Sequence, residues 1–188
     1  MNFRPAMGLF KESFRQLKIV GILGCIIYAL IGIMVPIGAN ISVRSVTNNY
    51  SVAATQAVYV FDVKYMMIVS AAIAVIIVPI MMLVAFNFLN KRNSCDFYHA
   101  IPVKRIPAFV GIIMAVVLWT IIMIFVETFT ISVMCGSLPR VKVECRSLMI
   151  TAVKTFALAF FFIGVLSAGI SLSGTLFSNI VVSGVIML

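Results

Sequence analysis

The chain has 188 residues, of which 63% are hydrophobic and 10% are charged, whereas an ordinary soluble domain is roughly 45–50% apolar and about 25% charged. Its mean hydropathy is +1.21. One core cannot hold this much apolar surface, because a chain of about 150 residues still exposes roughly 30% of its unfolded surface. The composition excludes a soluble globule, a disordered chain and a disulfide scaffold, and it predicts an all-α membrane protein that is solvated by lipid.

Positive charge is in excess, with fourteen Lys and Arg residues against five Asp and Glu residues. These bases lie in segments between apolar runs. We therefore interpret them as signals of membrane topology and not as a nucleic-acid-binding surface. No nucleic-acid partner is expected.

An amphipathic helix is predicted over residues 1–18. Its apolar side chains recur at steps of four and three residues, which places them on one side of a helix, and a basic stripe runs beside them. This pattern is typical of an interfacial helix with its aromatic side in lipid. The alternative is a short helix packed on the rest of the protein. The residues that define the interfacial helix are Phe3, Phe10, Phe14 and Arg15.

Four apolar runs are long enough to cross about 30 Å of hydrocarbon. They cover residues 19–39, 66–88, 107–133 and 155–172, and the fourth starts nearer Leu148 if Lys154 extends to the interface. A further run over 175–188, at about 14 residues, is too short to cross comfortably. We therefore expect a transmembrane domain over 19–188 with four full spans and a truncated fifth, the N-terminal part of a longer protein. Small residues at four-residue spacing favour close helix packing in the first and fourth spans: Gly21, Cys25, Ala29, Gly164 and Ala168.

The distribution of bases favours a cytoplasmic N-terminus. With that orientation, the inner segments hold eight bases and the outer segments hold six. Short loops with more Lys and Arg stay on the cytoplasmic side. The sequence therefore predicts a multi-pass protein of the plasma membrane.

The predicted outer segments contain two candidate features. Cys135 and Cys145 bracket one outer loop, where a disulfide could persist; the equally weighted alternative is two unpaired cysteines. The alternating residues 57–63 favour a small β-hairpin.

The acid Glu127 lies inside the third span, where an ionisable residue is a functional candidate. One candidate role of Glu127 is proton transfer or transport. The other, which we favour, is an interfacial position or the pairing of helices.

The inner segment 89–106 is the most distinctive part of the chain. A short helix capped by Ser94 and ended before Pro102 fits its residues, and its bulky aromatic side chains suit docking in a partner's groove. Burial against the ends of the spans is the alternative. A metal or nucleophile site at Cys95, Asp96 and His99 lacks further ligands, and the sequence contains no phosphate-loop motif of its own.

The run FLNKRNSCDFYHAIPVKR, from Phe88 to Arg105, resembles the segment of type FL.SKR..DFYHSLPVKR in permease subunits of bacterial ABC-2-type ABC transporters, especially those of Gram-positive bacteria. The stretch LSGTLFSN, from Leu172 to Asn179, is similar to the turn that follows the fourth span in that family. The order of the predicted elements agrees over the whole chain. The family subunit normally has six spans and often a large outer domain, and this chain departs from that pattern by ending within the fifth.

The resemblance implies a permease subunit that does not hydrolyse ATP itself. A short coupling helix would dock on a separate ABC ATPase, which binds ATP and Mg²⁺, and the N-terminal helix would be the elbow helix of the fold. A second copy of the permease or a homologous permease would complete the unit. By position, the docking residues are Asp96, Phe97, Tyr98, His99 and Pro102. Two other functions stay open: a non-transporting scaffold that binds a cytosolic partner through the same loop, and an intramembrane enzyme, for which Glu127 would have to lie beside His99.

Overall fold

The computed structural model describes residues 4–49, 59–60, 63–86, 105–138 and 141–172. Its helices are α1 (Arg4–Gln16), α2 (Lys18–Asn49), α3 (Val63–Ala85), α5 (Arg105–Ser137) and α6 (Cys145–Leu172), and its strands are β1 (Tyr59–Val60) and β2 (Val141–Lys142). The prediction of a helical bundle is confirmed. The apolar run 175–188 lies outside the described residues.

Among the described residues, four helices are long and apolar enough to cross a membrane, over Lys18–Ser42, Met66–Ala85, Phe109–Ser137 and Cys145–Ser171. Only 28–44% of each apolar window is buried inside the bundle, so most of each helix faces outward. Large outward side chains such as Phe125 and Phe161 are 67% and 60% exposed. Lipid suits such a surface, because a helix satisfies its own backbone hydrogen bonds and presents apolar side chains. The fold is that of a multi-pass membrane protein.

Three helices, α2, α5 and α6, are longer than the apolar runs that predicted them. α2 passes through Pro36 and continues to Asn49, and α6 begins at Cys145, well before Thr155. The side chain of Lys154 is exposed on the surface of α6, so this charged residue does not interrupt the helix. Hydropathy marks where a helix enters lipid, whereas backbone hydrogen bonds decide where the helix ends.

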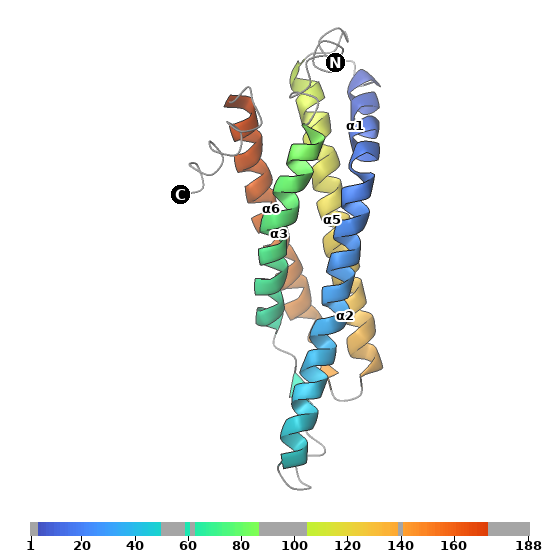
Figure 1. The fold of residues 1–188 in the computed structure, drawn as a ribbon, viewed down its shortest axis with the longest axis vertical. Coiled ribbons are helices and arrows are strands. Elements are labelled where there is room, and N and C mark those ends of the chain that lie inside the picture. Colours follow the sequence, from blue (N-terminus) through green and yellow to red (C-terminus); the bar gives the residue numbers. More distant parts are fainter. Residues whose placement is uncertain (1–3, 50–58, 61–62, 87–104, 139–140, 173–188) are drawn as a thin grey trace.

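The helices lie side by side along one axis, with α5 in contact with α1, α2, α3 and α6 (Figure 1). α2 and α5 run away from the end that holds α1, and α3 and α6 run back towards it (Figure 1). Near α1 and the middle of the bundle, the main core includes Leu17, Met81 and Trp119. A smaller core near the strands is formed by Met66, Ile131, Val141 and Leu148.

The amphipathic helix forms, and its aromatic side chains pack on α5. Phe10 and Phe14 pack against the main core, and Phe14 stacks on Trp119. α1 continues into α2 through a bend at the fully buried Leu17, whose N–H still donates to Ser13 O at 3.0 Å. Stacking on Trp119 buries the apolar surface of the Phe14 ring, and aromatic pairs of this kind are stabilising. Phe10 and Phe14 therefore contact the protein, as in the alternative of a packed helix, whereas Met7 of the same helix is 73% exposed. The interfacial position of this helix stays a prediction.

The two described strand residues of the segment predicted to form a β-hairpin pair with a distant segment. β1 pairs in parallel with β2, matching Tyr59 with Val141 and Val60 with Lys142. The strand partner thus comes from the segment between α5 and α6. Val141 of β2 is completely buried in the smaller core. Pairing of β2 with β1 therefore goes together with burial of this side chain.

Candidate functional site

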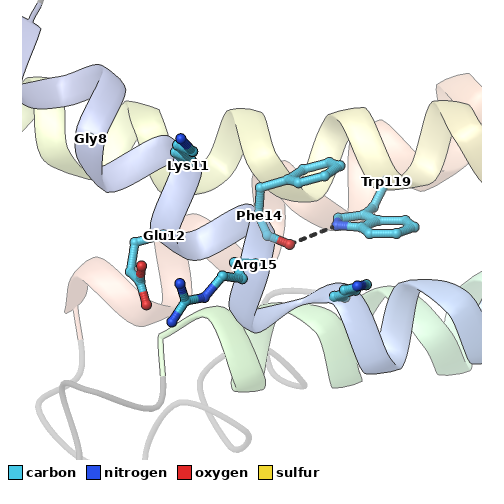
Figure 2. Close-up of a pocket in the computed structure, with 7 residues that line it drawn as sticks. Gly8, Lys11, Glu12, Phe14, Arg15 and Trp119 are labelled. Carbon is cyan, nitrogen blue, oxygen red and sulfur yellow. Dashed lines mark hydrogen bonds between the residues drawn. The ribbon is translucent and has the colours of Figure 1, made fainter.

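Two regions with polar side chains stand out in the described part of the chain, and the first is an open hollow between α1 and α5. It encloses about 430 Å³. Figure 2 shows the lining side chains of this hollow, where α1 lies beside α5. We call it the α1–α5 hollow, and it is lined by Gly8, Lys11, Glu12, Phe14, Arg15, Lys18 and Trp119.

Trp119 fixes the position of α1 in this hollow. Its ring stacks on Phe14 with centroids 4.9 Å apart and planes 14° apart, and its Nε1–H donates to the Phe14 carbonyl oxygen at 3.2 Å (Figure 2). Phe14 lies in the last turn of α1, where carbonyl groups need donors from outside the helix. A side chain at Gly21 would collide with the Trp119 ring. The ring therefore occupies space that only glycine leaves open.

The second region is a buried group of polar side chains on three different helices, which we call the interior cluster. It comprises Tyr28 on α2, Ser70 on α3 and Glu127 on α5, and none of the three is more than 3% exposed. Tyr28 Oη donates to the Ser70 carbonyl oxygen at 3.3 Å, and Ser70 Oγ donates to the Met66 carbonyl oxygen at 2.7 Å. These contacts join α2 to α3 within the apolar bundle.

Glu127 is the chemically unusual member of the interior cluster. Its carboxyl group also interacts with the Ser70 side chain, but Oε1 has no hydrogen-bond partner among the residues that the structure describes, although Glu127 is only 2% exposed. A buried polar atom without a partner costs about 1–3 kcal/mol. Burial excludes the interfacial role considered from the sequence, whereas contact with α2 and α3 agrees with the helix-pairing role.

Tyr28 and Trp119 were not identified as candidates from the sequence. Trp119 is the only tryptophan in the chain. Buried Trp and Tyr side chains usually have a partner for their polar atom. This preference could have marked both residues, although it does not name the partner.

The predicted docking residues Asp96, Phe97, Tyr98, His99 and Pro102, together with Phe3, lie outside the described residues. The helices on either side of the segment are described: α3 ends at Ala85 and α5 begins at Arg105. Both termini point towards the end of the bundle that holds α1 (Figure 1). Near this end the Phe86 and Phe109 rings lie 5.2 Å apart. The structure therefore brings α1 and both attachment points of segment 89–106 to one end.

The predicted disulfide is not formed in the structure. Cys135 and Cys145 are both free thiols; Cys135 is half-buried and Cys145 is exposed. Among the described residues, no group of three or more His, Cys, Asp or Glu side chains could hold a metal ion.

Comparison with known proteins gives no relative from which a function could be transferred. No protein-family model matches the chain, and no curated protein or solved structure shows significant similarity to it.

Proposed function

We propose that the chain is the membrane-spanning permease subunit of an ATP-driven transporter and that it couples to a separate ATPase through segment 89–106. The single observation that carries the proposal is the motif-bearing run from Phe88 to Arg105, placed between the second and third membrane-crossing helices. The resemblance of this run to ABC-2-type permeases supplies the class of transporter. In this proposal, ATP and Mg²⁺ are bound by the partner.

The arrangement of the bundle supports this proposal. The segment is attached to α3 and α5, and α5 contacts α1, α2, α3 and α6. The other attached helix, α3, contacts the four remaining helices as well. A force applied to the segment therefore acts directly on two helices that reach the whole bundle. Packed helices shift as units because the interior is close-packed. Movement of the ATPase would reach the other spans through α3 and α5.

Side chains of both regions contribute to the contacts between α5 and its neighbours. Trp119 attaches α1, and Glu127 lies against Tyr28 and Ser70 of α2 and α3. The outward faces of the bundle are apolar, with Ile76 and Phe125 more than 60% exposed. They are available to lipid or to the second permease that the resemblance implies.

Co-purification with an ATPase tests the proposal. The full chain would be co-expressed with a phosphate-loop ATPase encoded beside it in the genome. We expect Phe97→Ala and Tyr98→Ala each to reduce the retained ATPase at least about tenfold, because buried aromatic anchors dominate interface energies. Phe129→Ala is the matched control, since this aromatic side chain is 60% exposed on α5.

Unchanged retention in both segment variants would contradict coupling through this loop. Binding of a cytosolic protein without ATPase activity, lost in the same variants, would instead favour the scaffold function. Membrane insertion of each variant would be checked by its presence in the membrane fraction, so that loss of binding is distinguished from loss of the protein.

A further inference from the structure

We propose that the α1–α5 hollow binds the headgroup phosphate of an anionic phospholipid. Lys11, Arg15 and Lys18 supply the positive charge, and Phe14 and Trp119 form the aromatic wall. This site requires that the bundle lies in a membrane, and it does not depend on coupling to an ATPase. The two proposals can therefore fail separately.

The charge of the hollow favours an anion. Three of its lining residues are cationic and one, Glu12, is acidic. The cations follow one another at steps of four and three residues, so they share one side of the helical path through α1 into α2. Positive charge therefore exceeds negative charge in the lining of the hollow.

The position of the hollow along the bundle favours a lipid over a free anion. Lys18 is the first residue of the apolar window of α2, which places the hollow where hydrocarbon meets headgroups. Beyond Lys18, Ile22 and Ile26 continue at four-residue steps and are 44% and 50% exposed. A cationic patch that passes into an exposed apolar stripe matches a ligand with a charged head and an apolar tail.

Gly8 lines the hollow and leaves room for a larger side chain. A side chain at this position would meet no atom within 4 Å, so a larger residue could fill the space without disturbing the packing. At the opposite end of the bundle, a hollow of about 360 Å³ contains Arg146 and Lys154 beside Glu144 and has no aromatic wall. This second hollow provides a control with similar charge in a different setting.

The single tryptophan allows a direct measurement, because it lies in the wall of the hollow. The full chain would be reconstituted in phosphatidylcholine vesicles containing phosphatidylglycerol brominated on its acyl chains. Bromine quenches the fluorescence of a nearby indole. We expect at least a roughly fivefold preference of the Trp119 site for brominated phosphatidylglycerol over brominated phosphatidylcholine, since each base near the surface contributes about that factor.

Charge and space variants separate the site from general attraction to the surface. The triple variant K11Q/R15Q/K18Q should lose the preference, whereas K142Q/R146Q/K154Q, with the same change in net charge, should keep it. Gly8→Phe should weaken quenching although it removes no charge. Circular dichroism of each variant would verify helix content, and Gly8→Phe keeps the test decisive if the triple variant does not fold.

Equal quenching by the two brominated lipids would overturn the proposal, as would a preference that survives in both K11Q/R15Q/K18Q and Gly8→Phe. Inorganic phosphate added to the buffer distinguishes the two sources of the anion. It should leave the preference for phosphatidylglycerol intact, and abolition of the preference by phosphate would assign the hollow to a free anion and overturn the lipid site.

Discussion

The α1–α5 hollow and the interior cluster place polar groups in the same bundle in opposite ways. The hollow holds its charges at the end of a span, where water and headgroups can solvate them, and aromatic stacking closes its inner side. The interior cluster encloses Glu127 between helices and leaves Oε1 without a partner. Aromatic packing at the hollow therefore stabilises the fold, whereas the buried carboxyl group of Glu127 in the interior cluster destabilises it.

Removal of the Trp119 ring breaks the packing at the hollow and should have the largest effect. Trp119→Ala should lower the free energy of unfolding by about 3–5 kcal/mol, as for other large buried aromatic side chains. It would be measured by circular dichroism during titration of detergent micelles with dodecyl sulfate. Phe125→Ala on the same helix is the control, because Phe125 is 67% exposed. Similar losses in the two variants would contradict a special role for Trp119.

A larger residue at Gly21 attacks the same contact from α2. Gly21→Leu should lower the free energy of unfolding by about 1–3 kcal/mol, the usual cost of overpacking, because any side chain there meets the Trp119 ring. In the same titration Gly38→Leu should be nearly neutral, since a side chain at Gly38 meets no atom within 4 Å. Equal effects at both glycines would reject the close approach of α2 to Trp119.

Replacement of Glu127 by an apolar residue of similar length tests how much stability the interior cluster costs. Glu127→Met should raise the free energy of unfolding by about 1–2 kcal/mol, because it removes a buried atom without a partner. Ser70 keeps its hydrogen bond to Met66 O at 2.7 Å. A loss of stability would instead show that the carboxyl group holds the helices together.

The smallest effect is expected at Tyr28. Tyr28→Phe removes only the 3.3 Å hydrogen bond to Ser70 O and should lower the free energy of unfolding by about 0.5–1.5 kcal/mol. Thermal unfolding in detergent would detect this change. An effect as large as that of Trp119→Ala would make the interior cluster, and not the hollow, the main source of stability.

Apolar runs predicted the four membrane-crossing helices because hydropathy reports contact with lipid directly. They did not predict helix ends, since α2 continues to Asn49 and α6 begins at Cys145, beyond the apolar runs 19–39 and 155–172 that predicted these helices. Pairing of β1 with β2 joins distant segments, and local alternation of residues carries no information about such a partner.

Small-residue spacing was informative at only one of the two spans. Gly21 lies against Trp119, but a side chain at Gly164 would meet no atom within 4 Å. Periodicity located the aromatic side of α1 correctly, but it does not distinguish a side that faces lipid from one that packs on a helix. The partner of Phe14 lies on α5, and only the tertiary fold brings the two together.

The central claim is that segment 89–106 and α1 emerge on the side of the membrane that contains ATP. Single-cysteine variants retaining only Cys95 or only Cys145 would be labelled with a membrane-impermeant maleimide in right-side-out and inside-out vesicles. The account predicts labelling of Cys95 only in inside-out vesicles and of Cys145 only in right-side-out vesicles. The reverse pattern would place the segment outside the cell and contradict coupling to an ATPase.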